Sequence, residues 1–154
     1  MTLDAFFGTG IVRDLGSYTF DAEDIVAFAR QYDPQPKHLG QSPTGANATP
    51  CASCWHVSAV WMKLSLAAGM AGPEADWDGP GARPVFGPSP GFRNMRWPRA
   101  VFAGDTVAFA RTILGHRKLA SRPGWRILTI RGQAHSLSGE QVLDFDSGVL
   151  VQVD

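Results

Sequence analysis

Charged residues are scarce in this sequence, and neither sign is in excess. Among its 154 residues, 14 are lysine or arginine and 14 are aspartate or glutamate, so the formal net charge is zero. A chain that binds nucleic acid by neutralising phosphates needs a net basic surface, so we expect no nucleic-acid partner. Charged residues make up 18% of the chain, below the roughly 25% of typical soluble proteins. We therefore expect a second copy of the chain to cover part of the surface, in a homodimer or a dimer of dimers.

Cysteines, long apolar runs and early basic residues are also scarce. Two cysteines, Cys51 and Cys54, are too few for a secreted disulfide framework, and no second pair completes a zinc site. Arg13 is the first basic residue, so the chain does not begin like a signal peptide. No apolar run approaches the ~20 residues that a membrane-spanning helix needs. These absences predict a cytoplasmic protein without a membrane partner.

A first helix and a long loop are predicted from Asp21 to the second cysteine. Asp21 precedes apolar residues at 25, 28, 29 and 32, the spacing of one helical face, and its side chain can cap that helix. The prolines at 34 and 36 end the helix at Tyr32, because the residue before a proline avoids helical geometry. Residues 33–54 then form a long loop, which in a compact domain is often functional.

A second predicted helix is apolar on almost every side. Ser53 can cap it, it runs from about Trp55 to Ala68, and Gly69 ends it. A helix with so continuous an apolar surface must be buried on most sides.

The rest of the chain is a loop followed by strands. Half of the residues from 72 to 91 are glycine or proline, which indicates a loop. Ser138-Gly139 is predicted as the hairpin turn between the last two strands, and the last strand alternates with period two. An apolar helix followed by long antiparallel strands is buried most simply when a curved sheet wraps around it. The predicted class is therefore α+β, a hot-dog fold in one domain from 1 to 154. We expect strands at 106–114, 125–135 and 143–153.

Asp33 and His38 are the candidate reactive pair in the long loop. Two prolines hold this segment out of a helix and restrict its freedom, which suits groups that converge on one small target. The carboxylate can orient a water molecule or the imidazole, and the imidazole exchanges protons near neutral pH. By spacing alone, an aspartate that ends a helix and an exposed histidine are the plainer interpretation.

Two further segments have candidate binding groups. Backbone N–H groups at the start of a helix favour negative charge, so a donor near Cys54 can stabilise a thioester oxygen as it becomes an enolate. For His56 we favour a packed or solvated ring, and for Cys51 and Cys54 two inert residues over a redox pair. Three arginines between 93 and 99, with Arg96 in the middle, suit the phosphates of a nucleotide-bearing substrate such as coenzyme A, although a solvated strand edge is the simpler explanation.

These pieces, in this order, resemble the MaoC-like dehydratase family, the group that contains the (R)-specific enoyl-CoA hydratases. The resemblance extends from about Tyr18 to Val153. It rests on the helix Asp21 to Tyr32, the motif Asp33-x-x-Pro36-x-His38, the stretch Ala52-Ser53-x-Trp55-His56, and Arg96-Trp97-Pro98-Arg99 leading to Gly104-Asp105-Thr106.

The resemblance implies an enzyme that hydrates or dehydrates an acyl thioester. By position, Asp33 and His38 match the catalytic pair of the family motif Asp-x-Asn-Pro-x-His, which activates water for addition across the 2,3 double bond of an enoyl thioester. The implied substrate is an acyl-CoA, the implied unit is a dimer, and no metal or redox cofactor is implied. The implied substrate-binding residues are Gln35, Ser53, Cys54, Trp55 and Arg96.

Two positions depart from the family pattern, and two other functions stay open. Gln35 stands where the motif has asparagine, and Cys54 stands where glycine usually follows Ala-Ser. A side chain at 54 can narrow the acyl pocket or obstruct the backbone approach to the thioester oxygen. The alternatives are a hot-dog acyl-CoA thioesterase, whose water attacks the carbonyl carbon, and a non-catalytic acyl-binding or dimerisation module. Side chains from 72 to 92 are expected to close over the acyl tunnel.

Overall fold

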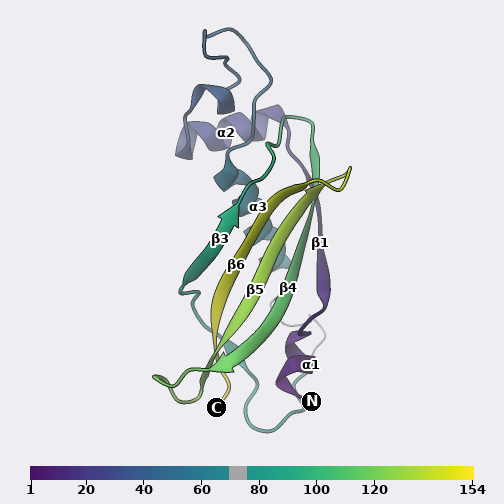
Figure 1. Ribbon diagram of the computed structural model, residues 1–154, viewed down its shortest axis with the longest axis vertical. Coiled ribbons are helices and arrows are strands. Elements are labelled where there is room, and N and C mark those ends of the chain that lie inside the picture. The colour runs from purple at the N-terminus through teal and green to yellow at the C-terminus, as the bar shows by residue number, and fades with distance from the viewer. Residues whose placement is uncertain (70–75) are drawn as a thin grey trace.

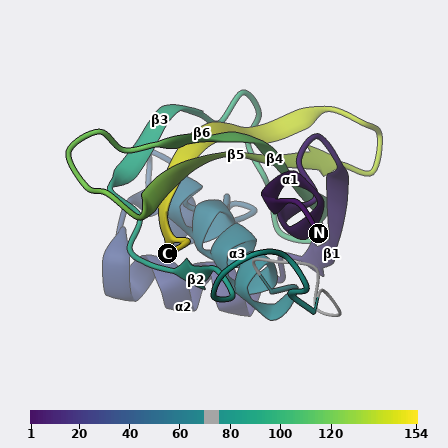
Figure 2. The same ribbon diagram turned by 90° about the horizontal axis from the view of Figure 1, so that it is seen from below.

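An antiparallel sheet curls around one central helix in the computed structural model, which describes residues 1–69 and 76–154 (Figures 1 and 2). The helix α2 and the loop after it lie at one end of the sheet, and both chain termini lie at the other (Figure 1). The elements are α1 (Leu3–Phe7), β1 (Val12–Thr19), α2 (Ala22–Tyr32), the 3-10 turn η1 (Pro36–His38), α3 (Cys54–Ala67), β2 (Val85–Phe86), β3 (Gly91–Arg96), β4 (Thr106–Lys118), β5 (Trp125–Ser136) and β6 (Gln141–Gln152).

The long strands β4, β5 and β6 form the middle of the sheet, in the order β1-β4-β5-β6-β2, and β3 also pairs with β6. Ser136 and Glu140 close the predicted hairpin turn between β5 and β6, where Gly139 takes a φ of 87°. The register between these strands shifts near the hairpin turn, at the end of β5 and the start of β6, where Ala134 opposes Leu143 but His135 opposes Gln141. The extra residue is a β-bulge, which allows Val142 and Leu143 both to be buried. The predicted α+β hot-dog fold is confirmed.

The predicted helix starts are confirmed by their capping hydrogen bonds. The Asp21 carboxylate accepts a hydrogen bond from the Asp24 amide at 2.8 Å and caps α2. The Ser53 hydroxyl accepts one from the Trp55 amide at 3.3 Å and caps α3, which begins one residue earlier than predicted. Each cap satisfies a backbone donor that has no partner within its helix.

The prediction that α3 is buried on most sides is wrong for the single chain. Its sheet-facing side is buried, and Trp61 both packs against Phe145 and donates a hydrogen bond to the Ala110 carbonyl at 2.9 Å. The sheet lies on one side of α3 and α2 lies on another (Figure 2), and a strip of residues along α3 stays exposed. The exposed members of that strip, with their exposed fractions, are Trp55 (52%), Met62 (50%) and Leu66 (62%).

Several short or peripheral elements carry too little apolar pattern to be predicted. In β1, which pairs only with β4, Leu15 is the sole buried residue and a register shift lies between Asp14 and Gly16. The two residues of β2 fall in the segment predicted as loop, where they pair with the end of β6. The part of that predicted loop from 72 to 75 lies outside the described residues. In the described ranges, no helix has the length and apolar character needed to cross a membrane.

His56 joins α2 to α3 through its ring. The imidazole is buried, stacks on Phe28 with ring centres 4.6 Å apart, and meets the edge of Phe20 at 5.1 Å. The favoured interpretation of a packed ring is therefore confirmed. Its Nδ1 atom has no hydrogen-bond partner among the described residues, and burial lowers the pKa of His56 below its ordinary value.

Replacing this ring by phenylalanine (His56→Phe) should remove part of the acid sensitivity of the fold. Below about pH 6.5 the unfolded chain takes up a proton at His56 that the folded chain, with its lowered pKa, does not. Stability then falls with acidification by up to about 1.4 kcal/mol per pH unit. Urea unfolding from about pH 7 to 5 should show a flatter pH dependence in the variant, with His135→Phe on β5 as the matched control. Equal slopes in His56→Phe and wild type would contradict this account.

Candidate functional site

The loop after α2 brings Asp33 and His38 to the start of α3. Asp33 is the residue that ends α2, and its amide donates to the Ala29 carbonyl at 2.9 Å. Pro34 follows it, and Pro36 opens η1, whose last residue is His38. The prolines therefore end the helix and begin a tight turn, so that side chains five positions apart face the same place.

The Asp33 carboxylate is held by two donors. Its Oδ1 accepts a hydrogen bond from the Gln35 side-chain amide, and its Oδ2 accepts one from the Ser53 hydroxyl, both at 2.7 Å. These bonds, with that from Gln35 having the larger effect, lower the pKa of Asp33 below its ordinary value. Asp33 is therefore ionised at neutral pH and fixed in orientation, as a proton acceptor must be.

His38 is buried between that carboxylate and a backbone carbonyl. Its Nε2 lies 3.3 Å from Asp33 Oδ2, and its Nδ1 lies 2.5 Å from the Cys51 carbonyl oxygen. A carbonyl oxygen only accepts hydrogen bonds, so Nδ1 carries a proton. In the neutral ring, Nε2 then holds the lone pair and accepts a proton, and in the charged ring it donates to Asp33. The pair can therefore move a proton between two adjacent groups.

A cavity of about 150 Å³ adjoins His38 and the first turn of α3. Among the described residues that line it, His38 comes from η1, and Cys54 and Val57 come from α3. Trp97 and Val101 come from the segment between β3 and β4. Asp33 is not among them, and it reaches the cavity through its contact with His38. The Cys54 amide belongs to the first turn of α3, where backbone donors have no partner within the helix. The site thus has a proton-transfer pair, a small cavity and a backbone donor.

Both cysteines are free thiols beside this cavity. Burial is the main cause that raises the pKa of Cys51 and of Cys54 above the ordinary value. A thiol with a raised pKa is a poor nucleophile at neutral pH, which supports the inert interpretation over the redox pair. Among the described residues, no group of three or more histidine, cysteine, aspartate or glutamate side chains is arranged to hold a metal ion.

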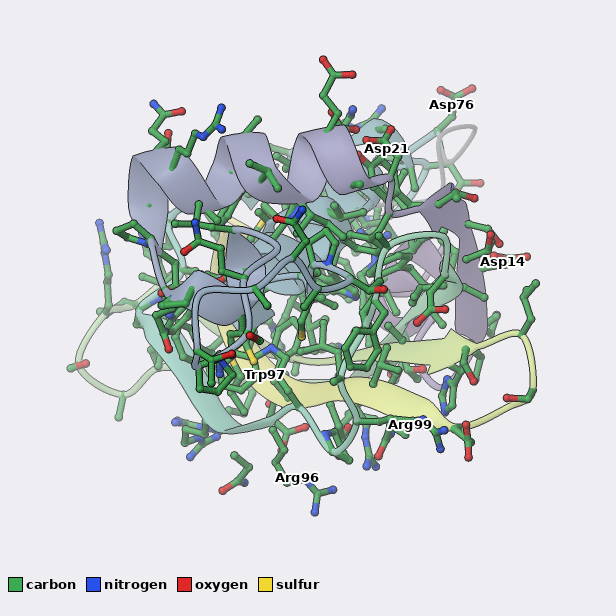
Figure 3. All side chains as sticks on the ribbon, turned by 90° about the horizontal axis from the view of Figure 1, so that it is seen from above. Asp14, Asp21, Asp76, Arg96, Trp97 and Arg99 are labelled. Atoms are coloured by element: carbon green, nitrogen blue, oxygen red, sulfur yellow. The ribbon has the colours of Figure 1, made fainter. Side chains whose placement is uncertain are left out.

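Trp55 and Arg96 do not join the cluster around Asp33. Trp55 is half exposed on α3, with its ring edge-on to Trp97 at 5.4 Å between ring centres. The Arg96 guanidinium donates to Asp144 at 2.6 Å and lines a different hollow with Arg131. In Figure 3, Arg96 lies at the margin opposite α2, whereas Trp97 lies further inside. The structure therefore does not bring Arg96 together with the other predicted site residues.

Two components of the site were not predicted from the sequence. The acceptor for His38 Nδ1 is a backbone carbonyl, which the side chain of Cys51 does not reveal. Trp97 lines the cavity, and although it belongs to the stretch Arg96-Trp97-Pro98-Arg99 that carries the family resemblance, it was not predicted as a site residue.

Similar solved structures are MaoC-like dehydratases and (R)-hydratases. A MaoC-like dehydratase from Rhodospirillum rubrum has a TM-score of 0.72 and 27% identity, over 95% of this chain and 93% of that chain. An (R)-hydratase from A. caviae involved in PHA biosynthesis has a TM-score of 0.62 and 19% identity, over 95% and 96%. The HadBC complex from Mycobacterium tuberculosis, a 3R-hydroxyacyl-ACP dehydratase, has a TM-score of 0.65 and 16% identity, over 92% and 96%.

The comparisons confirm the resemblance to the MaoC-like dehydratases. A further similar structure from Mycobacterium tuberculosis has a double hotdog fold, with a TM-score of 0.63, and this chain covers 42% of it. No family model matches the sequence, and a search of curated proteins finds no match. The likeness is therefore one of three-dimensional structure.

Removing the amide donor with Gln35→Leu should raise the pKa of Asp33. The carboxylate loses the hydrogen bond that lowers its pKa most, while the bond from Ser53 remains. Titration of the Asp33 carboxyl carbon by NMR measures the change directly. Gln31→Leu, on the exposed surface of α2, is the matched control. If Asp33 titrates at the same pH in both variants, the amide does not hold the carboxylate as described.

Proposed function

We propose that this protein is a hydro-lyase that reversibly hydrates an enoyl-CoA thioester to the 3-hydroxyacyl form. The observation that carries the proposal is the 3.3 Å approach of His38 Nε2 to Asp33 Oδ2 beside the start of α3. The likeness to MaoC-like dehydratases and (R)-hydratases supports the reaction class.

The proposed reaction uses one water molecule held by the pair. In hydration, the water oxygen bonds to C3 of the enoyl group, Asp33 accepts one proton from that water, and the pair delivers one proton to C2, so that the pair gains and loses one proton in each cycle. Asp33 is ionised and can accept a proton, and two hydrogen bonds fix its direction. His38 positions the water and exchanges the proton, since its Nδ1–H is engaged by the Cys51 carbonyl and its Nε2 faces the carboxylate.

The proposed oxyanion donor is the amide of Cys54. As C3 is attacked, negative charge develops on the thioester oxygen, and a donor at a helix start stabilises it. The thiol beside that amide has a pKa raised mainly by burial, so it stays neutral and does not repel the developing charge.

Lys37 and Arg99, rather than Arg96, give the cavity its cationic margin. Both line the cavity beside His38, and both are exposed. Arg99 also forms an ion pair with Glu140. Positive charge at this margin favours the approach of a negatively charged substrate such as the proposed acyl-CoA.

We also propose that the protein is a homodimer that covers the open strip of α3. Trp55, Met62 and Leu66 lie half exposed or more on one helix, a large apolar surface for a single chain. The similar HadBC and ChsH1-ChsH2 structures from Mycobacterium tuberculosis are complexes, which supports association through this fold.

Replacing either member of the pair should nearly abolish turnover without unfolding the chain. We expect Asp33→Asn and His38→Ala each to lower kcat for hydration of crotonyl-CoA by at least ~100-fold, as general acid–base groups do. Loss of enoyl absorbance measures the rate, and His135→Ala on β5 is the matched control. Near-normal turnover in either variant, or release of free thiol in place of hydration by the wild type, would contradict the proposal.

A charge placed in the exposed strip should dissociate the dimer. Met62→Glu puts a carboxylate on a surface that association would bury, and we expect the dimer Kd to rise at least about thirtyfold. Light scattering coupled to size-exclusion chromatography measures the mass. Leu137→Glu, in the exposed turn before β6, is the control. A wild-type monomer, or a Met62→Glu dimer of unchanged affinity, would refute this assembly.

A further inference from the structure

Trp97 is the largest side chain in the wall of the cavity beside His38. It comes from the segment between β3 and β4, and it faces residues of η1 and of the first turns of α3, including Cys54 and Val57. It is half-buried and packs against the core of the protein. Its indole therefore occupies space into which a longer ligand group would otherwise extend.

Two contacts fix this indole against α3. Its Nε1–H donates to the Ser58 hydroxyl at 3.1 Å, and that hydroxyl donates in turn to the Cys54 carbonyl at 3.1 Å. The ring of Trp55 meets it edge-on, with ring centres 5.4 Å apart. Pro98 follows directly and restricts the backbone. The indole cannot turn away without breaking a hydrogen bond and an aromatic contact, so the wall is rigid.

The volume of the cavity limits what it can hold. At about 150 Å³, it matches a cavity that accepts benzene, and it is well below the ~300 Å³ at which pockets for larger ligands begin. We infer that Trp97, held by Ser58, sets the acyl specificity of this site, which takes short or compact acyl groups and excludes long chains. This inference rests on the proposed function, because it assigns the cavity to the acyl part of the thioester.

The test compares how tightly the protein binds a short and a long acyl-CoA. Calorimetric titration with butyryl-CoA and decanoyl-CoA, which are saturated and cannot be hydrated, gives the ratio of their affinities. We expect wild type to favour butyryl-CoA, and Trp97→Ala to shift the ratio toward decanoyl-CoA by at least about tenfold, the effect of even one methylene in a hydrophobic pocket. Trp97→Leu, which keeps an apolar side chain, should shift it in the same direction and serves if the alanine variant does not fold.

Matched variants separate this inference from its alternatives. Trp125→Ala removes a tryptophan that lines another hollow, near the chain termini, and should leave the ratio unchanged. Ser58→Ala leaves the indole but frees it to turn, so it should shift the ratio in the direction of Trp97→Ala. Equal wild-type affinity for the two acyl-CoAs, or an unchanged ratio in the folded Trp97 variants, would overturn the inference. Failure of wild type to hydrate crotonyl-CoA, with the binding shift present, would instead refute only the proposed reaction.

Discussion

The hydroxyl of Ser53 makes two hydrogen bonds on which the candidate site depends. It donates to Asp33 Oδ2 at 2.7 Å and accepts from the Trp55 amide at 3.3 Å. The first bond aims the carboxylate and the second starts α3, so one buried group joins the end of α2 to the start of the central helix. Its side chain is 1% exposed, and leaving such a group without a partner would cost about 1–3 kcal/mol. The same hydroxyl therefore caps α3 and orients the proposed base.

The other end of α3 is held by a buried arginine from the sheet. Arg111, on β4, donates to the Ser65 hydroxyl at 2.8 Å, to the Ser65 carbonyl at 3.1 Å and to the Gly69 carbonyl at 2.6 Å. Burial lowers the pKa of Arg111 to about 10, so it keeps its positive charge at neutral pH beside the negative end of the helix dipole. With both ends anchored and Trp61 packed on the sheet, α3 is a rigid support. The side chains at its first turn are positioned by the whole fold rather than by the loop alone.

Beyond the overall fold, the details that could be predicted from the sequence were local, and the contacts that could not be predicted join separate segments. The caps at Asp21 and Ser53 follow from residues adjacent to the helices they start, and the approach of Asp33 to His38 follows from prolines within the same loop. The direction of the Arg96 side chain could not be predicted, because a register shift between Arg93 and Arg96, with Asn94 at a φ of 54°, breaks the alternation of β3. The carbonyl that binds His38 belongs to Cys51, 13 residues further along the same loop, and the wall formed by Trp97 comes from a much later segment, so neither had a periodic signal.

The central claim is that Asp33 and His38 act as one unit on one proton. A double-mutant cycle of kcat/KM for crotonyl-CoA, with Asp33→Asn, His38→Ala and the combined variant, tests it most directly. Groups that act as a unit are strongly non-additive, so the combined variant should be about as slow as the slower single variant. If the two losses instead multiply, the residues contribute independently and the paired mechanism is contradicted.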